Sequence, residues 1–124
     1  MPLSIFMPKG REWYAGNRPL GNGPTERPTM RDIAWAAGVY EGEGSVTKRG
    51  KGIRTNLVQK DAWLCLRLQA LFGGTLSVMR LTSRPGSTYT QWSLGGVRTE
   101  GFLYTIFTML SPRRRAQIRK VLGR

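Results

Sequence analysis

Residues 36–46 read AAGVYEGEGSV, and this stretch decides how the rest of the chain is interpreted. The chain holds seven acidic residues against twenty Lys and Arg, yet Glu41 and Glu43 stand only two positions apart here, between glycines. Near the C-terminus of a helix, two carboxylates repel each other and the negative end of the helix dipole. The pair is locally costly, so the sequence indicates that a cation compensates for it.

Helices and hairpins alternate outward from this stretch. Thr29 and Asp32 match the capping-box pattern, and apolar residues at helical spacing predict a helix over 30–41 that Gly42 and Gly44 end. Period-two alternation predicts hairpins over 45–60 and 75–94, on either side of a helix over 62–72. A helix over 99–109 follows, and Ser111-Pro112 begins a last helix that reaches residue 121. The predicted order is αββαββαα.

This order predicts an α+β fold in which one antiparallel sheet carries helices on one face and leaves the other face open. In the second hairpin, the expected inward positions are Leu76, Val78, Trp92 and Leu94. The open face is expected to carry residue types that hydrogen-bond phosphates and base edges, namely Thr47, Arg49, Arg54, Asn56, Ser77, Tyr89, Gln91 and Ser93. Every half-buried sheet has a polar face, so it is the positive charge of the chain that favours a binding role.

Length and charge bound the class of protein. The chain has 124 residues, of which 40% are hydrophobic, enough for one domain with a modest core. Residues 1–28 are rich in Pro and Gly without periodicity and predict an irregular arm, followed by a single domain over 29–124. The formal charge of +13 attracts polyanions, with nucleic acid the first candidate. The sequence has no apolar run long enough to span a membrane, so a membrane partner is not expected.

The residue types that are missing exclude several chemistries. Without histidine the chain can build neither a Ser-His or Cys-His nucleophile nor a His-ligated zinc site. An enzyme made from this chain would use carboxylates, backbone oxygens, basic side chains and a hard metal ion. The single cysteine, Cys65, lies in an apolar helical pattern and is expected to be a small core residue. No secretory signal is recognisable, so we expect a location in the cytoplasm, an organelle or the interior of a phage host.

The stretch at 36–46 resembles the signature helix of the LAGLIDADG homing endonucleases. Ala37-Gly38 stands at the close-packing positions, and Glu41 and Glu43 stand at the two acidic positions. Glutamate replaces the aspartate that many members carry. The resemblance extends over about residues 30–122 and includes Gln59-Lys60, Phe72-Gly73-Gly74, Trp92-Ser93-Leu94 and Ser111-Pro112-Arg113-Arg114-Arg115.

The resemblance implies roles for residues around the acidic pair. Glu43 is the implied metal ligand, with the Gly42 carbonyl as a second oxygen donor, and the implied metal is Mg²⁺ or Mn²⁺. Gln59 is implied to orient solvent at the metal, whereas Glu41 is more structural than ligating. In the family a basic residue, often lysine, lies near the scissile phosphate.

The basic residues of the chain are candidates for phosphate contacts. Arg113 and Arg115 are candidates for the catalytic basic position, and Arg114 and Lys60 are candidate DNA contacts. The alternative for the arginine run is a set of phosphate clamps without a catalytic role.

A single copy of the signature is present, and single-copy members of this family act as homodimers. Ala34, Ala37 and Gly38 leave one helical face without bulk, so two signature helices can approach closely, with Glu41 at the same interface. The alternative is that these small residues pack within one core.

The sequence therefore predicts a homodimeric, Mg²⁺-dependent, site-specific endonuclease that breaks both strands of a long pseudo-palindromic double-stranded DNA target, as in intron homing. The alternative is a relative that no longer cleaves and acts as an RNA maturase or a nucleic-acid-binding protein. A ribosomal-type RNA-binding protein fits the size and charge but leaves Glu41 and Glu43 unexplained.

Overall fold

The computed structural model describes residues 23–50, 52–80 and 88–123. Within these ranges the chain is an α+β protein, as predicted, and its elements follow the predicted αββαββαα order. The elements are α2 (Met30–Glu43), β1 (Gly44–Arg49), β2 (Gly52–Gln59), α3 (Trp63–Phe72), β3 (Thr75–Arg80), β4 (Thr88–Gly95), α4 (Val97–Ile106), the short 3-10 helix η3 (Phe107–Met109) and α5 (Pro112–Leu122). None of the described helices has the length and apolar character needed to cross a bilayer.

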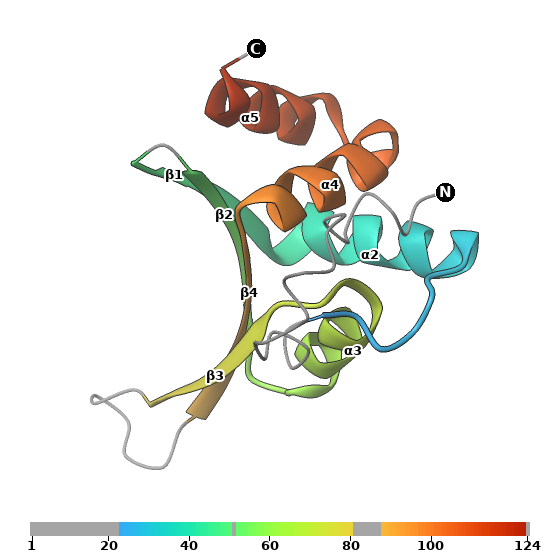
Figure 1. The fold of residues 1–124 in the computed structure, drawn as a ribbon, viewed down its shortest axis with the longest axis vertical. Coiled ribbons are helices and arrows are strands. Elements are labelled where there is room, and N and C mark those ends of the chain that lie inside the picture. Colours follow the sequence, from blue (N-terminus) through green and yellow to red (C-terminus); the bar gives the residue numbers. More distant parts are fainter. Residues whose placement is uncertain (1–22, 51, 81–87, 124) are drawn as a thin grey trace, which may run out of the picture.

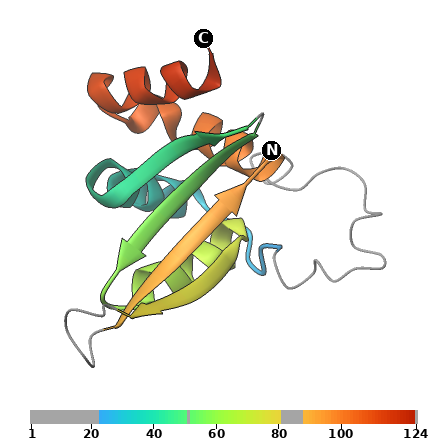
Figure 2. The same cartoon turned by 90° about the vertical axis from the view of Figure 1, so that its left-hand side faces the viewer.

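The four strands form one sheet in the order β1-β2-β4-β3, and every neighbouring pair is antiparallel. Helices α2, α3 and α4 cover one face of the sheet, and α5 lies beyond α4 near the β1 end (Figure 1). The strands bend so that the uncovered face is concave, and Figure 2 looks onto this face. The predicted arrangement of helices on one face and an open opposite face is confirmed.

An aromatic cluster anchors the helices to the sheet. The ring of Phe102 on α4 packs edge-on against Trp92 of β4 at 5.4 Å, Phe72 of α3 at 5.0 Å and Tyr40 of α2 at 6.2 Å between centroids. All four side chains are buried. The indole N–H of Trp92 donates to the Gly73 carbonyl at 2.8 Å, so the polar edge of this large side chain is also satisfied. Helices α2, α3 and α4 and the inner strand β4 therefore share one core.

Cys65 lies in the same core. Its side chain is fully buried, and its Sγ is 3.5 Å from the Thr90 carbonyl and 3.8 Å from the Leu57 carbonyl, to which the thiol can donate. Burial raises the pKa of the thiol. The expectation of a small core residue is confirmed.

Helix α2 runs directly into strand β1 without an intervening loop. The helix was expected to end at Glu41 but continues through Gly42 to Glu43, because a glycine weakens a helix by only about 1 kcal/mol relative to alanine and does not break it. Gly44 ends it, with its backbone N–H donating to the Tyr40 carbonyl. A Cβ at Gly44 would overlap the Tyr40 ring, so only glycine allows the strand to leave at this point.

Three other expectations are corrected. Helix α4 begins at Val97 and not at residue 99, because Gly96 (φ 65°) turns the chain immediately after β4, and its last predicted residues form η3. Val78 is 67% exposed, although it lies on the same sheet face as Leu76 and Trp92. The face was predicted correctly, but the helices do not extend over this end of the hairpin.

The segment before α2 is irregular, as predicted, but it is held against α3. The backbone N–H groups of Thr25 and Glu26 both donate to the Ala70 carbonyl. Residues 1–22 of the predicted arm lie outside the described residues. The described part of the arm is therefore docked on the domain.

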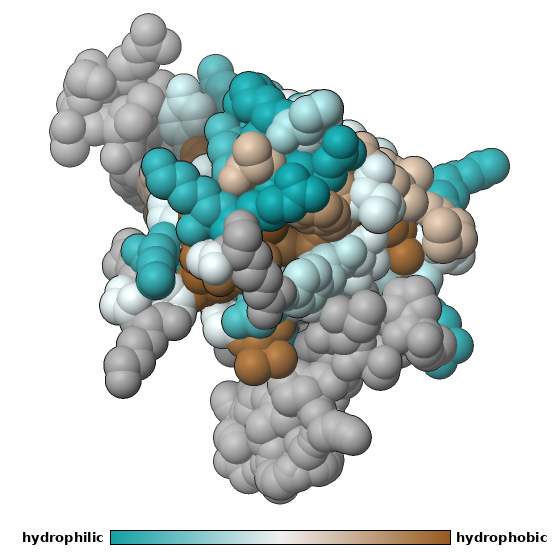
Figure 3. Space-filling model, turned by 90° about the horizontal axis from the view of Figure 1, so that it is seen from above, coloured by the Kyte–Doolittle hydropathy of each residue, from teal (hydrophilic) through white to brown (hydrophobic). Residues whose placement is uncertain are grey.

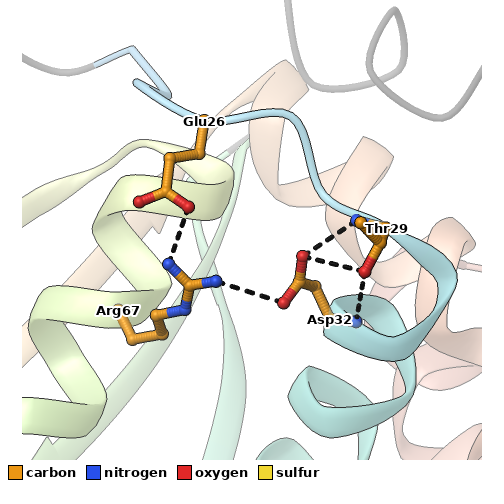
Figure 4. Close-up of polar contacts among 4 residues, drawn as sticks. All are labelled: Glu26, Thr29, Asp32 and Arg67. Carbon is orange, nitrogen blue, oxygen red and sulfur yellow. Dashed lines mark hydrogen bonds and ion pairs between the residues drawn. The ribbon is translucent and has the colours of Figure 1, made fainter.

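Arg67 joins this segment to the start of α2 (Figure 4). Its guanidinium contacts the Glu26 carboxylate at 2.7 Å and the Asp32 carboxylate at 3.2 Å. Asp32 closes the predicted capping box, accepting from the Thr29 backbone N–H at 2.9 Å while its own N–H donates to the Thr29 hydroxyl at 3.1 Å. The pKa of Asp32 is lowered, first by the hydrogen bond from the Thr29 backbone and then by those from the Thr29 hydroxyl and Arg67.

We predict that Asp32→Asn lowers the free energy of unfolding by about 1 kcal/mol at pH 7, the usual value of a helix cap. Because the pKa is lower in the folded state, the carboxylate stabilises the fold above its ordinary pKa of 3.8, and this contribution is lost as the pH falls through the folded-state pKa. Urea unfolding at pH 7 and pH 2.5 should show the difference between wild type and variant shrinking in acid. A difference that is independent of pH would contradict this account.

Candidate nucleic-acid interface and acidic helix end

Glu41 joins the end of α2 to the start of α5. Its carboxylate accepts a hydrogen bond from the Ser111 backbone N–H and another from the Ser111 hydroxyl, each at 2.8 Å. These two bonds, in that order, lower the pKa of Glu41. Ser111 is itself the N-cap of α5 and accepts from the Arg114 backbone N–H, as its Ser-Pro sequence predicted. The carboxylate of Glu41, assigned from sequence to a dimer interface, is thus engaged within its own chain.

Arg114 binds the backbone on both sides of Glu43. Its Nε donates to the Glu41 carbonyl at 3.1 Å and its Nη1 to the Gly44 carbonyl at 2.9 Å. The guanidinium also lies over the Tyr40 ring, 5.3 Å from the centroid. The last turn of α2 has no basic residue of its own, so this arginine supplies a cation at the negative end of the helix.

The cation that the acidic pair required is therefore partly provided by the chain itself. This also changes the interpretation of Arg114, which was predicted from sequence as a DNA contact. Most of its donors are occupied by carbonyl groups of its own chain. Its bonds to the carbonyls of Glu41 and Gly44 nevertheless hold the arginine run close to Glu43.

Glu43 is the last residue of α2, is exposed, and has no hydrogen-bond or ion-pair partner among the described residues. The neighbouring Gly42 is exposed as well. Gln59, the implied solvent-orienting residue, ends β2 and is half-buried. Gly44, which follows Glu43, pairs with Leu57 of β2. Gln59 is two residues further along β2. The fold thus brings Gln59 to the same end of the sheet as Glu43, without a hydrogen bond between the two side chains.

The oxygen ligands at this helix end are too few to hold a hard cation without further ligands from water or substrate. Among the described residues no group of three or more Asp, Glu, Cys or His side chains comes together. One chain offers the Glu43 carboxylate and the Gly42 carbonyl. Mg²⁺ commonly binds through one or two carboxylates and completes its shell with waters and substrate phosphates. The residues therefore fit a magnesium site that also draws on substrate oxygens.

The outward face of α2 is built from small residues. Ala34 and Gly38 are exposed four positions apart, and a Cβ built at Gly38 or Gly42 meets no atom within 4 Å. Ala37 is only 2% exposed and packs in the core of its own chain. Of the three small residues predicted for a dimer seam, Ala34 and Gly38 lie at the surface and Ala37 does not.

The three consecutive arginines have three different environments. Arg115 donates from Nη1 to the Leu110 carbonyl at 2.7 Å and is half-buried. Arg113 is exposed and has no hydrogen-bond or ion-pair partner among the residues that the structure describes. Since Arg114 is also engaged, Arg113 is the member of the run that is most available to a phosphate.

A cleft of about 400 Å³ separates α5 from the edge strand β1. Arg114, Gln117 and Lys120 line it from α5, and Ser45 and Val46 line it from β1. Figure 3 looks down on this end of the molecule, where hydrophilic side chains gather over α5. Sequence analysis did not single out Ser45, Gln117 or Lys120, because only the docking of α5 beside β1 brings them together.

The open sheet face carries the predicted polar residues. The register pairs Thr47 with Arg54, Asn56 with Ser93, Ser77 with Gln91, and Met79 with Tyr89, and directly opposed residues share a face. Lys60 follows β2 and is exposed, and Arg49 ends β1 with its side chain outside the described residues. Eight of the predicted contact residues are thus placed on one concave surface by the strand register: Thr47, Arg49, Arg54, Asn56, Ser77, Tyr89, Gln91 and Ser93.

The centre of this face is ordered by hydrogen bonds between side chains. Asn56, Gln91 and Ser93 bond to one another across β2 and β4. Beside them the Arg54 guanidinium extends over Gly95, where a Cβ would come within 3.3 Å of Nη2. The surface therefore combines the Arg54 cation, which has no hydrogen-bond or ion-pair partner among the described residues, with a preorganised amide cluster, and phosphate and base contacts use this mixture.

Comparisons with known proteins add no family to this description. No protein-family model matches the chain, and no curated protein matches it.

We predict that Arg114→Met lowers the free energy of unfolding by about 2 kcal/mol, because two charge-assisted hydrogen bonds to the end of α2 are lost. Arg113→Met is the matched control at the adjacent position, and it should change stability by less than about 0.5 kcal/mol. Urea unfolding at pH 7 measures both. Equal effects of the two substitutions would show that Arg114 does not hold the helix end.

Proposed function

We propose that the protein is a homodimeric, site-specific DNA endonuclease of the LAGLIDADG type that uses Mg²⁺ or Mn²⁺. The observation that carries the proposal is the position of Glu43. This exposed carboxylate, which has no partner among the described residues, stands where the signature-like helix passes into a sheet whose other face is open and polar, in a chain of formal charge +13. The αββαββαα order supports the resemblance that the signature residues indicate.

The residues near Glu43 have the chemistry that phosphodiester hydrolysis requires. Glu43 and the Gly42 carbonyl would hold the metal, which would supply charge neutralisation at the scissile phosphate and lower the pKa of a water. Gln59, at the end of β2, would orient solvent. Arg113, which makes no hydrogen bond or ion pair with the described residues, would bind the phosphate. No histidine base is needed for this chemistry.

The open sheet face would lie against duplex DNA. The concave shape of this face (Figure 1) suits the rounded surface of a duplex. Its polar side chains suit base edges, and the positive charge of the chain suits the phosphate backbones. The cleft between β1 and α5 adds Lys120 to the same end of the molecule as Glu43. Backbone contacts here would position the strand that is cut.

The dimer follows from the count of carboxylates. Within the described residues, each chain has one carboxylate at this helix end that no other group engages, and cutting both strands takes two such sites. Exposed Ala34 and Gly38 meet the first requirement of a close helix–helix seam, which is an accessible surface without side-chain bulk. A two-fold axis along this surface would place two Glu43 residues near each other.

A nucleic-acid-binding relative without cleavage activity is the second candidate. Arg114 and Ser111 already offset the negative charge at the end of α2, so the acidic helix end is tolerated without a metal ion. An RNA maturase would use the same open face and the same basic residues. Cleavage assays separate the two candidates.

We predict that Glu43→Gln abolishes cleavage and leaves DNA binding intact, because it removes the ligand charge with little change in volume. The assay is cleavage of a supercoiled plasmid library with randomised inserts, in Mg²⁺, in Mn²⁺ and in EDTA. Glu100→Gln, at an exposed carboxylate on α4, is the control that should cleave normally. Cleavage by clean Glu43→Gln protein would reject the site, and absence of cleavage by wild type in both metals would favour the second candidate.

We predict that Gly38→Leu separates the dimer and ends double-strand cleavage, because the added side chain keeps the two helices apart. In one chain a Cβ at this exposed position meets no neighbouring element, so the monomer should remain folded. Thr108→Leu adds a similar side chain at an exposed position on η3 and should leave the dimer intact. Sedimentation equilibrium measures the change, and a wild-type monomer bound to a full-length target would contradict the proposed dimer.

A further inference from the structure

Asn56 occupies the middle of the open sheet face, with a serine on each side. It pairs with Ser45 of β1 and with Ser93 of β4. Ser45 is exposed, and among the described residues its hydroxyl bonds only to the backbone carbonyl of Asn56, at 3.4 Å. Ser93 is 8% exposed, and its hydroxyl contacts the Asn56 side chain. The two serines thus have matching positions and different effects on the amide.

The carbonyl oxygen of the Asn56 side chain is fully used inside the protein. Oδ1 accepts from the Ser93 hydroxyl at 2.7 Å and from Gln91 Nε2 at 3.2 Å. Gln91 Nε2 also donates to Ser93 Oγ at 2.9 Å, which closes a three-membered ring of hydrogen bonds. An amide oxygen has two lone pairs, and both are occupied here. Asn56 Nδ2 has no partner among the described residues, so both of its N–H donors are available.

The distances within the ring agree with this direction, in which Ser93 and Gln91 both donate to Asn56 Oδ1. The 2.7 Å contact between Ser93 Oγ and Asn56 has the length of an O–H···O bond, and the 2.9 Å contact between Gln91 and Ser93 has that of an N–H···O bond. Rotating the Asn56 amide by a half-turn, so that its oxygen and nitrogen exchange places, would bring two NH2 donors together, those of Asn56 and Gln91. Turning both amides would place an N–H donor in the shorter contact and an O–H donor in the longer one, opposite to the usual lengths.

We propose that Asn56 acts as a one-way hydrogen-bond donor toward base edges and thereby selects guanine, and that Ser93 is the positioning residue that imposes this. The proposal rests on the proposed function in one respect, namely that the open face binds the major groove of duplex DNA. Asparagine ordinarily pairs with adenine by accepting from N6 and donating to N7. With Oδ1 occupied, that pairing is closed to Asn56.

Guanine is the base that matches a group with donors only. It presents two acceptors, N7 and O6, in the major groove, whereas adenine places an N6 donor beside N7 and cytosine presents the N4 donor. A donor facing a donor leaves both unpaired in a desolvated interface, which is costly. Thymine offers the O4 acceptor beside a methyl group and is the expected second choice. The order of preference is therefore guanine, then thymine, with adenine and cytosine disfavoured.

The inference is tested by exchanging the serine on either side of Asn56. Wild-type full-length protein is first used to select sites from a randomised duplex DNA library at fixed salt. Asn56→Ala then identifies the base position that Asn56 reads, as the position at which preference is lost. Dissociation constants for the four bases at that position are measured for wild type, Ser93→Ala, Ser93→Thr and the matched control Ser45→Ala.

We expect wild type to prefer guanine over adenine on the order of tenfold, the usual scale of one such base contact. Ser93→Ala should reduce this ratio to near one or reverse it, because the freed Oδ1 can accept from adenine N6. Ser93→Thr keeps the hydroxyl and should keep the preference. Ser45→Ala leaves both donors to Oδ1 in place, so the ratio between the four bases should stay the same even if the loss of a cleft residue changes overall affinity. Should Ser93→Ala not fold, Gln91→Met removes the other donor to Oδ1 and should relax the preference in the same direction.

Two results overturn the inference while the proposed function stands. One is a wild-type preference for adenine or cytosine at the Asn56 position. The other is the same guanine preference in wild type and Ser93→Ala. If wild type selects no duplex sequence at all, the proposed function fails and this inference fails with it, so the two failures are told apart by the first selection alone.

Discussion

The negative end of α2 is the constraint around which this structure is arranged. The C-terminus of a helix carries a partial negative charge from the helix dipole, so two carboxylates placed there add unfavourable negative charge. Residues at the start of α5, about seventy positions later in the chain, compensate for this charge. Ser111 donates two hydrogen bonds to the Glu41 carboxylate, and Arg114 donates two to backbone carbonyls at the end of α2. Of the two carboxylates, that of Glu43 is the one without a partner in the part of the chain that the structure describes. The same contacts hold α5 beside β1 and so create the cleft between them.

Local signals explain how much of the fold could be predicted. Capping at Thr29 and at Ser111, the glycines after α3 and the period-two strands are short-range patterns, and the structure contains all of them. Whether a helix covers a given part of the sheet depends on long-range packing. The alternation of residue types therefore placed Val78 on the correct face but could not show that no helix packs over it. The end of α2 was misjudged because Gly42 is tolerated in a helix, whereas Gly44 is required by its contact with Tyr40.

The candidate site was predictable only in part, for the same reason. Residue type and strand phase were enough to place Arg54, Asn56, Gln91 and Ser93 together on one surface. They could not distinguish three adjacent arginines, because the docking of α5 determines which one turns inward. Nor could they show that the amide and hydroxyl groups on the open face bond to each other and so lose part of their freedom to bind anything else.

The buried thiol of Cys65 has a practical consequence. It is the single cysteine of the chain, it is inaccessible in the folded state, and its surroundings raise its pKa. A thiol reagent can therefore modify the protein only when α3 separates from the sheet, because Cys65 lies between that helix and the carbonyls of β2 and β4. The rate of labelling then reports how often this part of the core opens. The native chain thus carries an internal probe of its own opening kinetics, with no engineered label and no second cysteine to confuse the signal.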